Sequence, residues 1–318
     1  MTTRLRESRG QTLVFFVVLM GGLVLLLAFV LNVGAAANTQ RQMQSLADGA
    51  ALAGVQQLPF DQNGAITAAG QYGSCSSVNC LITFPDTQTI NVRVSRAVSG
   101  LLLPLVTTPT ARATATARIE PAESLNNSDL RRVSSPNPKP YLVPLVVNQA
   151  RACPAASCFG PGAQQTLSLG PGDGSGDFGF MCEGSSCTSG RRGGGGRNAL
   201  ARQLRCQPQS NCLGQTYSTR SGVPAAAPGT ATGGQIGAAL RNIEGTTLIV
   251  PVYSSNGGGY NIAAFAAFVI TDVPYWDNAN GHQITGYFTT YTTPGHLADP
   301  NSVIPSTNYG VSVIGLTQ

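Results

Sequence analysis

The sequence predicts an α+β protein that has one apolar helix near its N-terminus and a β-rich remainder. Three observations lead to this fold class. A long apolar run is followed by a helix-forming segment, alternating apolar and polar residues further along predict strands, and eight cysteines lie in closely spaced pairs among glycines and prolines. At 318 residues, the chain has room for one or two domains.

The apolar run extends from Leu13 to Leu31 without one polar residue. As a helix it would be about 28 Å long, close to the thickness of the hydrocarbon core of a bilayer. We therefore expect a transmembrane helix over residues 11–33. Three arginines and Glu7 precede the run, within a tail of residues 1–10, whereas Arg41 alone follows it closely. This asymmetry predicts a cytoplasmic N-terminus and an extracytoplasmic C-terminal part.

A cleaved secretory signal is the alternative to a permanent anchor. Gly34 to Ala37 is a small-residue segment that a signal peptidase accepts, and cleavage there would leave a chain beginning at Asn38. The continuation argues against cleavage, because residues 35–58 contain no proline, are rich in Ala, Gln and Leu, and predict more helix. Cleavage sites are usually extended.

We expect the helix to continue as a juxtamembrane stalk over residues 34–58, with a kink, if any, at Gly34. It should end before Pro59, because the residue before a proline is pushed out of helical geometry. Small residues and one methionine recur along the stalk at spacings of three and four: Met43, Ala47, Ala50 and Gly54. Such a stripe allows another helix to approach closely, so it predicts a packing face.

Arg9-Gly10-Gln11, the apolar run and the stalk sequence QSLADGAALAG (residues 44–54) together resemble the N-terminal segment of TadE/TadG-like proteins of Flp, or tight-adherence, pilus assembly. The resemblance covers about residues 1–58, is looser over 88–119 and is weak beyond 140. It implies a pilin-like stalk and a cell-envelope role in adhesion, with the pilus assembly platform or pilin subunits as partners.

One departure from the pilins of this class bears on processing. They are cut after a glycine and carry a glutamate five residues into the mature helix. The corresponding bond here would join Gly10 to Gln11, but the fifth residue is then Phe15, and no acid lies between Glu7 and Asp48. A carboxylate within a span is costly and kept for a purpose, so its absence favours an unprocessed, anchored TadG-like protein over a filament subunit. A minor pilin processed after Gly10 stays an alternative.

Residues 59–120 predict a small α+β unit. A short helix is expected at residues 66–72, and alternating patterns predict strands at 87–95 and 110–119. An apolar patch lies between these strands at residues 101–106. Residues 121–140 are rich in proline, serine and asparagine and predict a linker.

Residues 141–318 predict a β-rich extracytoplasmic domain that carries a long, irregular insertion pinned by disulfides. Pro144 and Pro251 are expected to place their strands at sheet edges or bends. The expected strands are residues 141–147, 246–253, 262–272 and 283–292, and the expected helices are residues 197–205 and 235–243.

The eight cysteines form four local pairs, which favour short-range disulfides in an oxidising compartment. The candidates are Cys75 with Cys80, Cys153 with Cys158, Cys182 with Cys187, and Cys206 with Cys212. A zinc site is disfavoured because C-x2-C spacing is absent, and the only two histidines lie far from every cysteine in the sequence.

Several weaker patterns resemble ligand sites. The glycine-rich stretch from Gly190 to Arg197 lacks the lysine and hydroxyl residues of a phosphate loop and reads as a flexible basic loop. Asp173 and Asp177 lie four positions apart in a glycine-rich turn, which predicts either a calcium site that borrows Glu183 or an ordinary polar turn. Phe178-Gly179-Phe180 predicts a structural hairpin.

No catalytic motif is evident. His282 and His296 have no motif context, and the carboxylates of Asp272 and Asp277 are an ordinary pair near a turn. The net charge is +5 and charged residues make up 10% of the chain, so no basic face for nucleic acid is expected. The sequence thus predicts a non-enzymatic, single-pass protein of the bacterial cytoplasmic membrane without a cofactor or small-molecule substrate.

Overall fold

The computed structural model divides into two compact units. The first comprises Met1–Gln57, Gln62–Ala117 and Leu316–Gln318, and the second comprises Leu58–Asp61 and Arg118–Gly315. The structure describes residues 8–98, 110–132, 140–152, 159–162, 164–170, 176–181, 183, 195–206, 212–219, 222–226, 228–256, 259–293 and 309–317. The confirmed fold class is a long apolar N-terminal helix, then mixed helix and strand, then a β-rich region.

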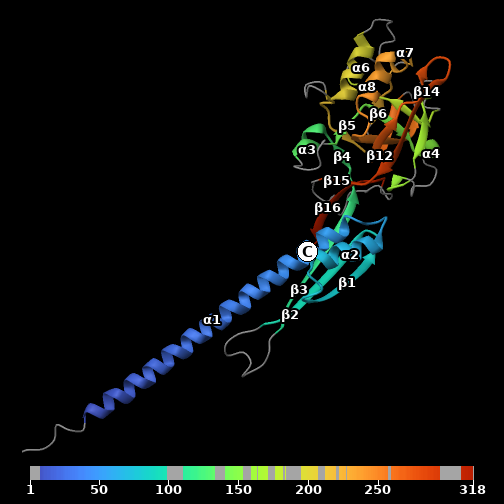
Figure 1. The fold of residues 1–318 in the computed structure, drawn as a ribbon. Helices are drawn as coiled ribbons and strands as arrows, with labels where there is room; N and C mark the ends of the chain where they lie inside the picture. Colours follow the sequence, from blue (N-terminus) through green and yellow to red (C-terminus); the bar gives the residue numbers. More distant parts are fainter. Residues whose placement is uncertain are drawn as a thin grey trace, which may run out of the picture. The chain divides into compact units, whose positions relative to one another are not determined.

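The first unit begins with helix α1 (Ser8–Val55), which is continuous along its whole length (Figure 1). It passes Gly34 without interruption, so the kink considered there is not observed. The helix ends at Val55, slightly before the expected end at Leu58, and a turn follows in which the amide of Gln57 donates to the carbonyl of Gly54 at 3.1 Å.

The rest of the first unit is one short helix and strands of a five-stranded sheet, of which β1, β2 and the first part of β3 lie in this unit. Helix α2 (Gln62–Tyr72) starts four residues earlier than expected. The sheet has the order β1-β2-β3-β16-β15. Its strands are β1 (Asn79–Asp86), β2 (Thr89–Ala97), β3 (Thr110–Pro121), β16 (Val311–Thr317) and β15 (Tyr291–Thr293), the last of which pairs parallel with β16. Strand β1 had no sequence signal that we recognised. The apolar patch at residues 101–106 lies outside the described residues.

The second unit is built on a sheet that closes on itself, because its last strand is bonded to its first. Neighbouring strands pair in the order β7-β14-β12-β11-β6-β8. The amide of Asp177 then donates to Ser168 at 2.9 Å, and the amide of Gly170 donates to Phe178 at 3.3 Å, which links β8 back to β7. The strands are β6 (Leu145–Asn148), β7 (Gln165–Ser168), β8 (Phe178–Phe180), β11 (Thr247–Asn256), β12 (Gly259–Asp272) and β14 (Gly281–Thr289).

Three helices, α6 (Gly195–Arg205), α7 (Pro228–Ala231) and α8 (Gly234–Arg241), lie together within this unit (Figure 1). Their apolar side chains share one core with the strands: Leu200 and Ile236 are fully buried in the same cluster as Phe268. The remaining short elements are β4 (Ser124–Leu125), α3 (Asn127–Arg132), β5 (Tyr141–Leu142), α4 (Gln149–Ala152), β9 (Tyr217–Ser218), β10 (Gly222–Pro224) and β13 (Trp276–Asp277).

The segment between β6 and β11 is less irregular than predicted. Strands β7, β8 and β10 all lie within it, and each pairs with a strand of the main sheet. Part of the expected linker is also ordered, because Leu125 and Leu130 are buried and Asn127 exchanges hydrogen bonds with the backbone of Leu142 at 2.7 and 3.1 Å. The glycine-rich composition of this segment predicted loops. Its strands form by pairing with distant strands, and such pairing leaves little pattern in the local sequence.

Pro251 does not lie at a sheet edge, so the first of the two settings predicted for its strand, an edge or a bend, is wrong. Strand β11 pairs with β12 on one side and with β5 and β6 on the other. The proline is tolerated because the pairing on the second side is interrupted at this point: it involves Leu248 and Ile249, then resumes at Val252. A residue without an amide proton therefore loses no ladder bond there.

Candidate functional site

The N-terminal half of α1 is a candidate membrane-spanning segment. Its large apolar side chains, from Leu13 to Val33, are between 51% and 74% exposed, with Met20 the least and Phe15 the most exposed. The helix is long and apolar enough to cross a membrane, with a mean hydropathy of 3.1 in its most apolar window. Water-exposed apolar surface of this extent marks a contact with lipid or protein.

The C-terminal half of α1 carries the predicted stripe, and the structure buries it. Met43, Ala47 and Ala50 are at most 1% exposed, and Val55 is fully buried. Gly54 lies where a Cβ atom would be 3.0 Å from both the Ala65 carbonyl oxygen and the Ala69 Cβ. The stripe thus allows close helix packing as predicted, but the helix that approaches is α2 of the same unit.

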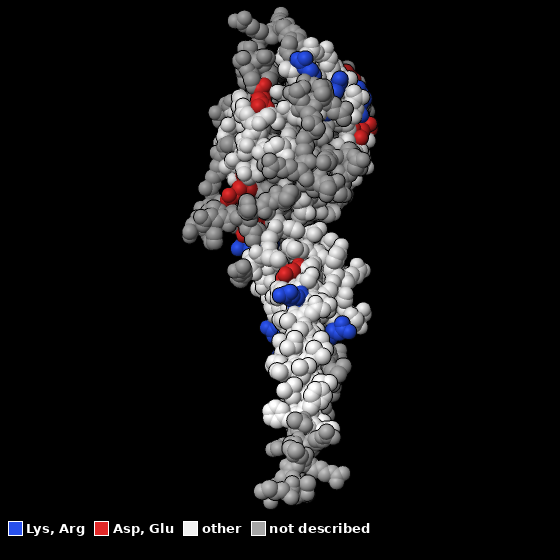
Figure 2. Space-filling view, turned by 90° about the vertical axis from the view of Figure 1, so that its left-hand side faces the viewer, with Lys and Arg blue, Asp and Glu red and all other residues white. Residues whose placement is uncertain are grey.

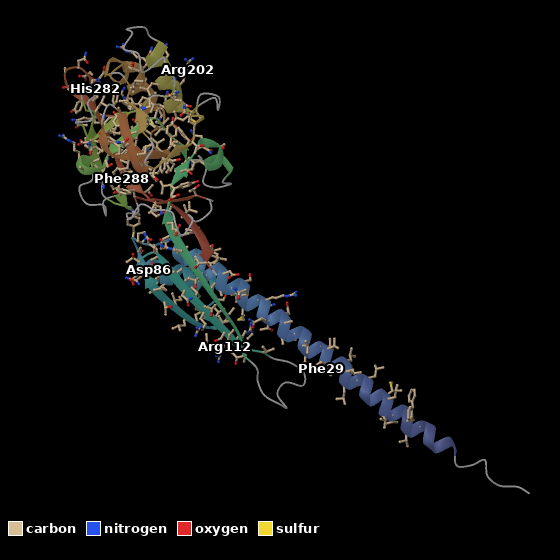
Figure 3. All side chains as sticks on the ribbon, turned by 180° about the vertical axis from the view of Figure 1, so that it is seen from behind. Phe29, Asp86, Arg112, Arg202, His282 and Phe288 are labelled. Carbon is tan, nitrogen blue, oxygen red and sulfur yellow. A yellow bond between two sulfur atoms is a disulfide. The ribbon has the colours of Figure 1, made fainter. Side chains whose placement is uncertain are left out.

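A junction separates the two halves of α1. The side-chain amide of Gln40 donates to the backbone carbonyl of Arg112 at 2.6 Å, which fixes the start of β3 beside this part of the helix. Figure 3 shows Arg112 at the end of the sheet nearer Phe29 of the apolar half, with Asp86 at the opposite end. Sequence reasoning missed this junction, because seventy-two positions separate the two bonded residues.

The proposed processing bonds both lie within α1. Gly10 and Gln11 belong to its first turns, and residues 34–37, the alternative signal-cleavage segment, are helical. Signal peptidases act on extended chain, so the helical geometry at Ala37 favours retention of the apolar segment.

Two local disulfides are present in the part of the chain that the structure describes. Cys75 and Cys80 join the turn after α2 to β1, with a Cα–Cα distance of 5.4 Å. Cys206 and Cys212 close the turn after α6, with a Cα–Cα distance of 4.3 Å. The other candidate pairs, Cys153 with Cys158 and Cys182 with Cys187, lie outside the described residues.

The acidic residues considered for calcium are engaged by backbone groups. The carboxylate of Asp177 accepts from the amide of Ser168 at 2.9 Å, and that of Glu183 accepts from the amide of Gly214 at 3.1 Å. Burial raises the pKa of Tyr217 above its usual range, and the charge of Glu183 adds to the shift. Asp173 is outside the described residues. Within the described ranges, no group of three or more His, Cys, Asp or Glu residues could hold a metal ion.

The carboxylate of Asp277 closes a turn. It accepts from the amides of Asn280 at 2.7 Å and Ala279 at 2.8 Å, and the hydrogen bonds from Asn280 lower its pKa. A general acid would need the opposite shift. His282 lies edge-on to Trp276, with ring centroids 5.1 Å apart, while His296 is outside the described residues.

Two other motifs also have structural settings. Phe178-Gly179-Phe180 is strand β8 of the closed set of strands, which replaces the predicted hairpin. A Cβ on Gly179 would collide with the hydroxyl of Tyr260, so the glycine is needed for packing. Of the glycine-rich basic loop, residues 195–197 are described, and they begin α6.

Comparison with known proteins places the resemblance on the helix. Residues 10–57 match the family model of Flp pilus-assembly TadE/G-like proteins. This match confirms the resemblance predicted for the N-terminal segment, and it covers α1 almost completely. No curated protein and no solved structure matches the chain.

Proposed function

We propose that this chain is a non-enzymatic, TadG-like component of a Tad/Flp pilus-assembly apparatus, held in the cytoplasmic membrane by the N-terminal half of α1. The observation that carries the proposal is the coincidence of the family match at residues 10–57 with a helix whose first half is uncovered and apolar. The second half is already covered within its own unit, so lipid is the natural surrounding for the first half.

The orientation follows from charge. Three arginines precede the span, which favours a cytoplasmic N-terminus and export of the second unit and of the part of the first unit that follows the span. The disulfides at Cys75–Cys80 and Cys206–Cys212 support this orientation, because disulfides persist in oxidising compartments. The exported units would then contact pilin subunits or the assembly platform.

A minor pilin is the second candidate. A long helix whose C-terminal half packs on an antiparallel sheet is suited to insertion in a filament, and this geometry favours that alternative. The absence of any acid between Glu7 and Asp48 opposes it. A secreted binding module cleaved after Ala37 is opposed by the helical backbone at that bond.

Intact-mass analysis of protein from washed membranes separates these proposals. An anchored, unprocessed protein gives the mass of the whole 32.8 kDa chain in the membrane fraction. A chain beginning at Gln11 would select the minor pilin, and a soluble chain beginning at Asn38 would select the secreted module. Alkylation with and without reductant counts the disulfides in the same sample.

A further inference from the structure

The folded first unit brings four arginines to the end of its sheet that lies nearest the apolar half of α1. We name them the arginine collar: Arg41, Arg93, Arg96 and Arg112. All four side chains are exposed. The hydrogen bond from Gln40 to the Arg112 carbonyl places the beginning of β3 at the level of Arg41 on α1.

The register of β2 against β3 sets the level of the other two. Asn91 donates to the hydroxyl of Thr116 at 2.7 Å, and Nε of Arg93 donates to the hydroxyl of Thr114 at 3.4 Å. Continuing this antiparallel register puts Arg96 beside the start of β3. Arg93 then lies about 10 Å further from that end of the sheet than Arg96, since three residues of a strand span this distance.

The collar lies close to the expected membrane surface. Gln40 follows Leu31, the last residue of the apolar run, by nine positions, which is about 13 Å along a helix. The headgroup layer occupies roughly 5–8 Å on each side of the hydrocarbon core. Arginine side chains are long and extend their charged ends toward such an interface, so the collar can reach lipid phosphates.

Local carboxylates do not neutralise the collar. The nearest acid along α1 is Asp48, which accepts a hydrogen bond from Gln44 at 2.7 Å and lies about 10 Å further from the span. Asp86 is at the opposite end of the sheet (Figure 3). Among the described residues, the recorded ion pair joins Arg118 to Glu120, so no collar arginine is paired with a carboxylate there. Figure 2 shows how sparse acidic side chains are on the face of this unit that it presents.

We propose that the arginine collar binds the phosphate groups of anionic phospholipids, giving the protein a second contact with the membrane beside its apolar helix. The inference rests on the anchoring proposed above. The collar is positively charged and these phospholipids are negatively charged, so the two surfaces are complementary. Each basic residue near an anionic surface strengthens binding about five-fold. The collar holds the first unit against the bilayer and so limits the tilting of this unit, α1 included, relative to the membrane.

The test uses the full chain in detergent, with bound lipids counted by native mass spectrometry during titration with phosphatidylglycerol or phosphatidylethanolamine. The wild type should prefer phosphatidylglycerol. The variant R96Q/R112Q should bind it roughly thirty-fold more weakly, and R96K/R112K should keep most of the binding. The matched control R151Q/R202Q removes the same charge from exposed positions in the second unit and should bind normally.

Several results would overturn the proposal: equal affinity for the two lipids, equal loss in the control variant, or displacement of the lipid by millimolar inorganic phosphate, which would indicate a free-anion site. Membrane fractionation of the same variants separates this proposal from the anchoring itself. If the collar binds no lipid but the anchoring is correct, the variants and the wild type all stay in the membrane fraction. If the anchoring proposal is wrong, the wild type is found in the soluble fraction as well.

Discussion

The two halves of α1 belong to one continuous helix and have opposite surroundings. The large apolar side chains from Leu13 to Val33 are more than half exposed, whereas Met43, Ala47 and Val55 in the second half are buried. The second half is lined by small residues because α2 and β2 approach it closely. The first half is lined by Leu, Val and Phe, with nothing comparable over it among the described residues. The comparison teaches that the fold covers one half with its own elements and leaves the other, which is long and apolar enough to cross a membrane, uncovered.

The largest expected effect comes from charging the uncovered half. The variant L23K/L26K places two lysines at the centre of the span, at a cost of about 5–7 kcal/mol for insertion. We expect the protein to be lost from carbonate-washed membranes. Leu81 is also more than half exposed but lies on β1, so L81K serves as the control and should fractionate normally. If the double variant inserted normally, the first half of α1 would not differ from the second half in the way described.

Two glycines test the covered half with the same substitution. Gly54→Ala brings a Cβ to within 2.5 Å of Ile90 Cδ1 and 3.0 Å of a backbone oxygen, whereas nothing lies within 4 Å at Gly49. We expect Gly54→Ala to lower the free energy of unfolding by up to about 3 kcal/mol. Gly49→Ala should raise it by about 0.5–1 kcal/mol, because alanine favours helix. Urea unfolding of detergent-solubilised protein measures both, and equal effects would contradict the packing described.

The Cys75–Cys80 disulfide allows a test of the elements that cover the second half of α1. It ties the turn after α2 to β1 and closes a short loop, which contributes about 2 kcal/mol in the chain-entropy model. C75S/C80S should therefore make the first unit more sensitive to protease in urea. The C206S/C212S variant is the control, since its bond lies in the second unit. If protease digested the first unit faster in the control variant than in C75S/C80S, the stabilisation of the first unit by the Cys75–Cys80 disulfide would be refuted.

The smallest effect is expected at the junction. Gln40→Ala removes the exposed hydrogen bond to Arg112, and water can replace it, so the loss should be about 0.5 kcal/mol. Hydrogen exchange should speed up locally at the start of β3, while membrane fractionation stays normal. Faster exchange throughout the sheet would show that this bond has a larger role than its exposure implies.

The sequence was sufficient where the signal is local. Hydropathy identified the candidate span, spacing of small residues identified the packing stripe, and alternation identified β3 with its first residue at Thr110. The cysteines joined in the structure are close neighbours in sequence, so their pairing was also accessible. Strand β8 and the environment of Pro251 were not, because each depends on which distant strand lies beside it.

By itself, the sequence determined that one segment of this protein must avoid water and that the next must pack closely, since side-chain size and polarity recur along a helix at fixed spacing. Only the tertiary structure decided what covers the second segment and which charges gather beside the first. Arg93, Arg96 and Arg112 are remote from the span along the chain, and the return of the sheet toward α1 brings them near it. Chain order cannot show this because strand pairing acts over distances in sequence that local patterns do not encode.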